Sequence, residues 1–98
     1  MKLEYKRNLL KDGSKTIANI NGDRLRSGNG SSAICNVRDD NVRKANGSTT
    51  LCNVRNGDIR DGNGSSRKAK VKDIKKMIRG SESLSDVFVA AIWQTFIR

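Results

Sequence analysis

Hydrophobic and polar positions recur along the chain with a period of 17 residues. Three consecutive units show it most clearly: SKTIANINGDRLRSGNG (14–30), SSAICNVRDDNVRKANG (31–47) and STTLCNVRNGDIRDGNG (48–64). The segment 2–13 resembles the second half of a further unit, and 65–80 resembles a degraded fourth full unit. A fixed period of this kind indicates one supersecondary structure copied in tandem. We therefore predict units at 2–13, 14–30, 31–47, 48–64 and 65–80.

Within each unit, numbered from the serine that follows the closing glycine, apolar and polar residues alternate. Position 5 is small (Ala18, Cys35, Cys52, Ala69), position 6 is polar (Asn19, Asn36, Asn53), position 7 is β-branched (Ile20, Val37, Val54, Val71) and position 12 is aliphatic (Leu25, Val42, Ile59). A period of two is typical of a half-buried strand. We expect the position-7 residues to be buried at equivalent places in successive units.

Each unit also carries two turn signals. Mid-unit pairs favour a two-residue connection with positive φ (Gly22-Asp23, Asp39-Asp40, Asn56-Gly57), and Asn-Gly pairs close the units (Asn29-Gly30, Asn46-Gly47, Asn63-Gly64). A unit is thus a β-hairpin. Isolated hairpins are marginally stable, so the units must pack on one another. Five copies predict a mainly β fold that forms a closed ring or a short solenoid, since closure removes exposed strand edges.

The last unit departs from this pattern. Lys68 replaces the Ile or Leu of position 4, and the mid-unit turn glycine is missing. Ile74, Met77 and Ile78 instead follow Asp73 at helical spacing. A degraded strand and a short helix both remain open for this segment.

The composition changes after Gly80, which divides a repeat domain (1–80) from a C-terminal segment (81–98). Ten of the fourteen residues from 84 to 97 are apolar, and Ser83 with Asp86 has the form of a helix-capping box. We predict an α-helix that is apolar on all sides, with a strand as the alternative. Fourteen helical residues rise roughly 21 Å, less than the ~30 Å of a hydrocarbon core, so a simple transmembrane span is not expected.

Units of this form, repeated about five times and followed by a short apolar tail, resemble the small bacterial five-fold β-flower proteins. The resemblance covers residues 2–80 well and the tail loosely. It implies a ring of hairpin petals, and it implies no catalytic residues and no particular function. The basic fourth full unit departs from the family pattern.

Charge and chemistry narrow the classes of function. The chain has 20 Lys and Arg against 10 Asp and Glu, a net charge of +10, two cysteines and no histidine. The lack of histidine excludes Ser/His/Asp and Cys/His nucleophilic sites and the common zinc sites. We predict a protein that is not an enzyme and binds no cofactor or metal. The N-terminal MKLEYKRNLL lacks the apolar stretch of a secretory signal, so we expect a cytoplasmic protein with free thiols.

Cys35 and Cys52 hold the same repeat position and exchange with Ala18 and Ala69. The exchange indicates small core residues. A disulfide or redox pair between neighbouring units is the alternative interpretation.

Two basic rows recur with the repeat, at position 8 (Arg38, Arg55, Lys72) and position 13 (Arg26, Arg43, Arg60). Such rows could bind a polyanion or nucleic acid through phosphate contacts. Tyr5 is the one aromatic residue before position 88, so a platform for base stacking is absent from the sequence. Ordinary solvated strand faces are the competing interpretation.

The apolar tail gives the leading functional hypothesis. We expect the ring interior, lined by Ala, Cys, Ile and Val, to be too narrow for a helix. The tails would then associate, making a homo-oligomer through residues 84–97, with an interface at Leu84, Val87, Phe88, Ile92, Trp93 and Phe96. Truncation after Gly80 would leave a smaller, still β-rich particle. The hypothesis is a non-enzymatic structural or interaction module that self-associates, with polyanion binding and peripheral membrane association beside the basic run 67–76 as the alternatives.

Overall fold

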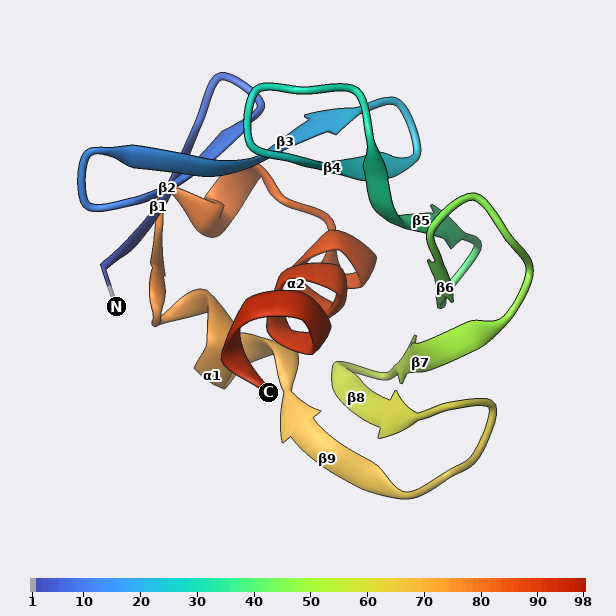
Figure 1. The fold of residues 1–98 in the computed structure, drawn as a ribbon. Helices are drawn as coiled ribbons and strands as arrows, with labels where there is room; N and C mark the ends of the chain where they lie inside the picture. The colour runs from blue at the N-terminus through green and yellow to red at the C-terminus, as the bar shows by residue number, and fades with distance from the viewer. Residues whose placement is uncertain (1) are drawn as a thin grey trace.

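The structure is a computed structural model and describes residues 2–98. Ten strands form one continuous sheet in the order β10-β1-β2-β3-β4-β5-β6-β7-β8-β9 (Figure 1). Their bounds are β1 (Leu3–Lys6), β2 (Leu9–Asp12), β3 (Lys15–Asn21), β4 (Arg24–Ser27), β5 (Ala33–Arg38), β6 (Asn41–Lys44), β7 (Thr50–Arg55), β8 (Asp58–Asp61), β9 (Arg67–Lys70) and β10 (Ile78–Arg79). The helices are α1 (Val71–Lys75) and α2 (Asp86–Ile92), with a 3-10 turn at Ser81–Ser83 and a π-helical turn at Trp93–Ile97. The protein is mainly β with a C-terminal helix, as predicted.

The mid-unit turns lie where the sequence places them. Pairs β3–β4, β5–β6 and β7–β8 are antiparallel hairpins. Gly22, Asp39 and Asn56 open their turns with φ of 60°, 54° and 53°. Positive φ in a two-residue turn matches the twist of the flanking strands. The hairpin repeat is therefore confirmed.

The loops that close the units differ from the expectation. The left-handed residues are Gly28, Ala45 and Gly62, with φ of 52°, 49° and 52°, two positions before the predicted Asn-Gly glycines. Gly13 is the equivalent residue of the first unit. Its N–H donates to the carbonyl oxygen of Lys2 at 3.0 Å, and the Gly28 N–H donates to the carbonyl oxygen of Ile17 at the same distance. The 17-residue spacing of Gly13 from Gly30 is thus misleading. The connection between the first two units is two residues shorter than the later ones.

The sheet is not closed, so the predicted closed ring is wrong. Strand β10 pairs in parallel with β1, and β9 forms the opposite edge of the sheet. Residues 71–75 between them form α1, with Val71 and Ile74 buried. The mid-unit turn pair of this segment would be Asp73-Ile74, and the helix instead buries Ile74 together with Val71. Val71 therefore lies on a helix and not on an equivalent strand.

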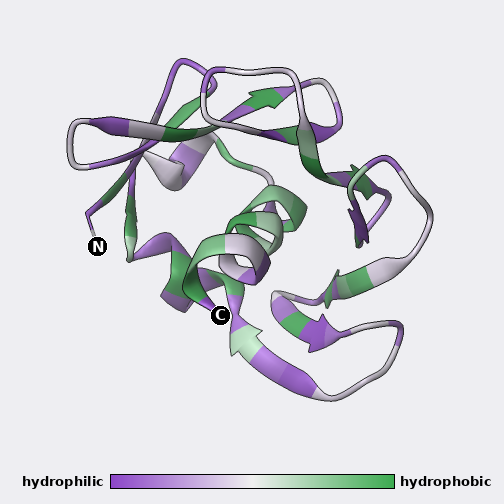
Figure 2. Ribbon diagram, in the orientation of Figure 1, coloured by the Kyte–Doolittle hydropathy of each residue, from purple (hydrophilic) through white to green (hydrophobic). Residues whose placement is uncertain are grey.

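The C-terminal helix lies inside the curve of its own sheet (Figure 1). Figure 2 shows hydrophobic residues on the strands and on α2 where they approach one another. Val89, Ala90, Ala91 and Ile92 are fully buried, as are the inward residues Ala18, Leu25, Cys35, Val42, Cys52 and Ile59. The expectation that the interior is too narrow is wrong. Small residues on both sides let the helix approach the strands closely, as where the Cys52 sulfur lies 4.0 Å from the Ala90 carbonyl oxygen.

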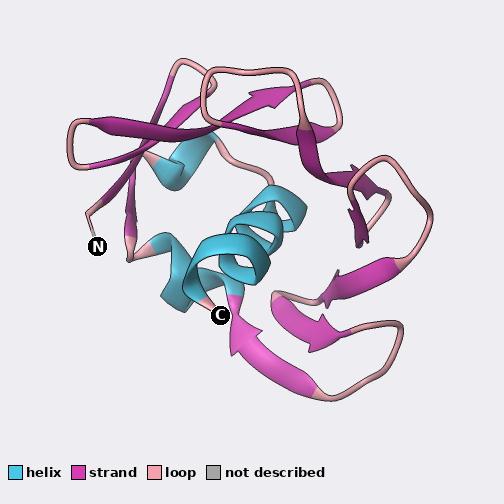
Figure 3. Cartoon of the chain, viewed as in Figure 1, coloured by secondary structure: helices cyan, strands magenta, loops and turns pink. Residues whose placement is uncertain are grey.

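Positions 5 and 12 therefore form the main inward layer of the strands. Val54 is buried as predicted, whereas Ile20 and Val37 are only partly buried and pack at the margin of the core. Figure 3 shows the strands arranged around the helical segments.

Two local features join the tail to the sheet. Gly80 has a φ of 80°, and a Cβ there would clash with the carbonyl oxygen of Tyr5, so only glycine fits between β10 and the following turn. Helix α2 begins after Ser85, whose side chain accepts a hydrogen bond from the Phe88 N–H at 3.4 Å. The N-cap is therefore Ser85 and not Ser83.

Candidate functional site

Three asparagines at position 6 shape the outer surface of the sheet. The side-chain nitrogen of Asn36 donates to the carbonyl oxygens of Ala45 at 2.8 Å and Gly47 at 3.1 Å. Asn19 makes the same pair of hydrogen bonds to Gly28 and Gly30, and Asn53 to Gly62 and Gly64. Each asparagine thus holds the closing loop of its own unit against its own first strand. The sequence shows that asparagine recurs at position 6, but only the loop geometry shows which carbonyl groups it binds.

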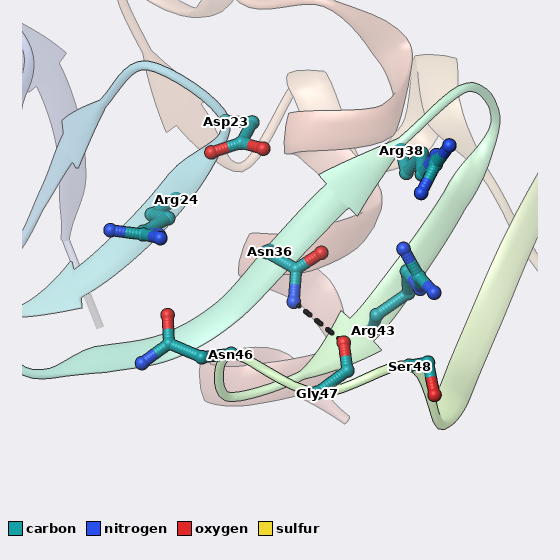
Figure 4. Close-up of a pocket in the computed structure, with 8 residues that line it drawn as sticks. All are labelled: Asp23, Arg24, Asn36, Arg38, Arg43, Asn46, Gly47 and Ser48. Carbon is teal, nitrogen blue, oxygen red and sulfur yellow. Dashed lines mark hydrogen bonds between the residues drawn. The ribbon is translucent and has the colours of Figure 1, made fainter.

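A groove of about 560 Å³ lies on this outer surface, between β4 and the β5–β6 hairpin (Figure 4). It is lined by Asp23, Arg24, Asn36, Arg38, Arg43, Asn46, Gly47 and Ser48. Figure 4 shows Arg38 and Arg43 on one side, and Asp23 and Arg24 across the groove on the neighbouring hairpin. Two adjacent repeat units therefore build one site.

Strand register explains why these side chains meet. Arg24 is paired with Asn36 across β4–β5, and Asn36 is paired with Arg43 across β5–β6. Their chain neighbours Leu25, Cys35 and Val42 are fully buried. Since successive side chains of a strand point to opposite faces, the paired polar residues face outward. The Val37 N–H donates to the Asp23 carbonyl at 2.8 Å and fixes the first hairpin beside the second.

The groove carries unneutralised positive charge. Four ion pairs occur among residues 2–98: Arg67–Asp58, Lys75–Asp86, Arg79–Glu4 and Arg98–Asp61. None of them involves the three arginines of the groove. Asp23 adds one carboxylate, so the groove holds three guanidinium groups against one acid. Its guanidinium donors can therefore bind an anion.

The two predicted basic rows do not form one continuous site. Of their six members, only Arg38 and Arg43 line this groove. Arg26 donates from Nε to the Gly30 carbonyl at 3.2 Å. Arg55 and Arg60 belong to the next unit, and Lys72 lies on α1. The Arg60 Nε is buried and has no hydrogen-bond partner among the described residues.

Arg24 is the functional candidate that sequence reasoning missed. It holds position 11, which is Asn41 and Asp58 in the following units. Because this position varies from unit to unit, the repeat pattern does not mark it. Only the pairing of β4 with β5 places Arg24 beside the position-8 and position-13 arginines of the next unit.

The residues predicted as an oligomer interface are largely internal. Leu84, Ile92 and Trp93 are buried in the fold of their own chain. Val87, Phe88 and Phe96 are partly buried and pack against the same core. The tail's apolar surface is thus covered mainly by the strands that precede it. Met77, at 53% exposure, is the large hydrophobic residue left most open in the described part of the chain.

The two cysteines are free and buried under the helix. Burial raises the pKa of the Cys35 thiol to about 11 and that of Cys52 to about 12. The Cys52 sulfur lies 4.0 Å from the Ala90 carbonyl oxygen. Thiols of this kind are protonated and poorly nucleophilic at neutral pH, so they serve the core as small side chains. This arrangement confirms the core interpretation and not the disulfide alternative.

The fold defines a class: a tandem β-hairpin repeat protein whose open sheet wraps its own C-terminal helix and presents a basic outer surface. No protein-family model, curated protein or solved structure matches the chain. Among residues 2–98, no helix has both the length and the apolar character needed to cross a membrane. The function is therefore inferred from the residues of the groove.

Proposed function

We propose that this protein is a non-enzymatic module that binds the phosphate backbone of a nucleic-acid strand on its outer surface. One observation carries the proposal: Arg24, Arg38 and Arg43 line a single groove, and none of them is paired with a carboxylate of residues 2–98. The net charge of +10 adds a long-range attraction for polyanions.

The chemistry of the groove favours phosphate and a sequence-independent mode of binding. Guanidinium groups match phosphate oxygens in a bidentate geometry. Neutral donors and acceptors from Asn46 and Ser48 stand beside them. The eight residues that line the groove include no aromatic side chain, so stacking on bases, the usual source of additional affinity for single strands, is not provided there.

Asp23 favours a nucleic acid over a heavily sulfated polysaccharide as the polyanion. Its carboxylate repels a ligand that places several anionic groups in the groove at once. A nucleic-acid strand carries one charge per nucleotide and offers base amino groups, and in RNA also the 2′-hydroxyl, from which a carboxylate accepts hydrogen bonds.

The two other candidate functions need an accessible tail. Self-association through residues 84–97 and insertion into a membrane surface both require the apolar side chains of the tail to face outward. Leu84, Ile92 and Trp93 instead lie in the core, and Val87, Phe88 and Phe96 are half-buried against it. Nucleic-acid backbone binding is the function that the accessible residues support best.

The proposal is tested by fluorescence anisotropy with a labelled single-stranded DNA of mixed sequence. We expect binding at ~50 mM salt that weakens steeply by ~200 mM, because each phosphate contact releases a condensed cation. Arg38→Ala with Arg43→Ala should flatten the dependence on salt by about two phosphate contacts. The charge-matched control, Lys6→Ala with Lys15→Ala, removes two exposed cations outside the groove and should change it far less. Absence of binding at ~50 mM salt would rule the proposal out.

A further inference from the structure

The groove is one of four places along the sheet that share one backbone hydrogen bond, the fourth of them formed by the start of α1 and not by a strand. At each, the N–H of a position-7 residue donates to a backbone carbonyl in the mid-unit turn of the preceding unit. The pairs are Ile20 with Asn8, Val37 with Asp23 and Val54 with Asp40, each at 2.8 Å, and Val71 with Gly57 at 2.9 Å. We number these places grooves 1 to 4 in this order, by their shared backbone geometry; hollows lie at groove 2, which is the arginine-lined groove, and at groove 4.

The four grooves differ in charge at matched positions. The residue after the accepting carbonyl is Leu9, Arg24, Asn41 and Asp58 in grooves 1 to 4. The residue after the donating N–H is Asn21, Arg38, Arg55 and Lys72. The position-13 residue is Arg26, Arg43 and Arg60 in grooves 1 to 3. Groove 2 is the one in which all three are arginine.

The formal charges follow from these residues. Groove 2 has three arginines and Asp23, a net charge of +2, whereas groove 3 has two arginines and Asp40, a net charge of +1. Groove 1 has Arg26 alone, and this side chain already donates to Gly30. Groove 4 has Lys70, Lys72 and Lys75 against Asp58 and Asp86, and both acids are ion-paired, with Arg67 and Lys75.

We infer that groove 2 is the single phosphate-binding site and that Arg24 is the residue that distinguishes it from the other three. The inference rests on the proposed function. Arg24 and Asn41 hold the same place in the register, opposite Asn36 and Asn53 respectively. Grooves 2 and 3 therefore differ in one guanidinium, which supplies a charge and a planar set of donors that an amide lacks. They also differ in the residue paired with the position-8 arginine, which is Asn41 beside Arg38 and Asp58 beside Arg55. The repeat supplies the scaffold four times, and position 11 decides where it binds.

The chain itself provides matched controls for the test. Arg38 and Arg55 are both exposed position-8 arginines in equivalent strands, one in groove 2 and one in groove 3. With the full chain and a short single-stranded DNA, we expect Arg24→Ala and Arg38→Ala each to weaken binding on the order of tenfold. Arg55→Ala should weaken it by less than about twofold, since it loses only long-range charge.

A gain-of-function variant completes the test. Asn41→Arg with Asp58→Asn gives groove 3 the three arginines of groove 2 and removes the carboxylate paired with Arg55. Titration of this variant at a protein concentration well above the Kd should rise from one to two oligonucleotides per chain. Circular dichroism should show the same thermal unfolding for all variants, because these side chains are on the outer face. The affinity for a sulfated heparin fragment, measured in parallel, shows whether the groove prefers phosphate or sulfate groups.

The outcomes separate the two proposals. If the wild-type protein does not bind the oligonucleotide, the proposed function fails. If it binds but Arg38→Ala and Arg55→Ala weaken binding equally, the proposed function stands and the single-groove inference is overturned. That inference is also overturned if Arg24→Ala has no effect, or if Asn41→Arg with Asp58→Asn leaves the stoichiometry unchanged. Tighter binding to heparin than to the oligonucleotide would replace the nucleic-acid ligand by a sulfated one.

Discussion

At the scale of single residues, the position-6 asparagines fix the outer surface. Asn36 is 8% exposed although it faces outward, because the loop it holds covers it. Its two hydrogen bonds satisfy the carbonyl groups of Ala45 and Gly47, which have left the strand ladder. Ala45 holds a left-handed conformation with φ of 49°, which a non-glycine residue adopts only under constraint. Asn36 thus stabilises a loop conformation that is unfavourable for Ala45.

Asn36→Ala should therefore destabilise the protein by about 1–2 kcal/mol, since two hydrogen bonds are lost and two carbonyl oxygens depend on water instead. Chemical denaturation measures the change. Asn46→Ala in the same unit is the control, because that side chain is exposed and makes no hydrogen bond to the described residues. Equal destabilisation by the two variants would contradict the role assigned to Asn36.

At the scale of elements, α2 covers the inner face of the sheet, as a second sheet does in a β-sandwich. It contacts β4, β5, β6 and β7 as well as α1, so a seven-residue helix supplies the core of four strands. Arg98 fixes the C-terminal end of the tail. Its Nη1 lies 3.0 Å from Asp61 Oδ1, and its Cζ lies 5.0 Å from the centre of the Trp93 ring. The Arg98 guanidinium lowers the pKa of the Asp61 carboxyl. Both ends of the tail are thus anchored to the sheet.

Ile92→Ala should cost about 2–5 kcal/mol of stability, because it removes a fully buried side chain and leaves a cavity between helix and strands. Val87→Ala, on the same helix but partly exposed, should cost about 1 kcal/mol or less. Thermal and denaturant unfolding of the two variants provides the comparison. A small effect at Ile92 would mean that the helix does not occupy the interior.

At the scale of the whole molecule, the strands and the tail form one core with a radius of gyration of 12.2 Å. Each hairpin alone is marginally stable, and strands β4 to β7 share α2 as a packing partner. The open edges of the sheet at β9 and β10 are bridged by α1 and not by hydrogen bonds to each other. Stability is therefore shared across the chain and not additive over units.

Removal of residues 81–98 should abolish cooperative unfolding and expose the inward layer, so that the shortened chain aggregates or stays unfolded. Sedimentation and near-ultraviolet circular dichroism would show this. The prediction reverses the expectation from the sequence that the repeats remain folded without their tail. A compact, cooperatively unfolding fragment of residues 1–80 would contradict it.

The sequence by itself determined the local structure. Alternation predicted the strands, the pairs Gly22-Asp23 and Asn56-Gly57 predicted the hairpin turns, and small residues at position 5 marked the core face. Strand alternation and turn type depend on residues only a few positions apart, so both can be recognised within one 17-residue unit. The resemblance to five-fold β-flower proteins, by contrast, stays a prediction.

Only the tertiary structure decided where the tail lies, whether the sheet closes and which arginines meet. Cys52 and Ala90 lie 38 residues apart in the chain, and Arg24 and Arg43 belong to different hairpins. The apolarity of residues 84–97 required burial but did not specify the partner. That choice depends on the width of the curved sheet, which small side chains on both the strands and the helix set together. Such contacts depend on packing in three dimensions, and the pattern of residues along the chain does not predict them.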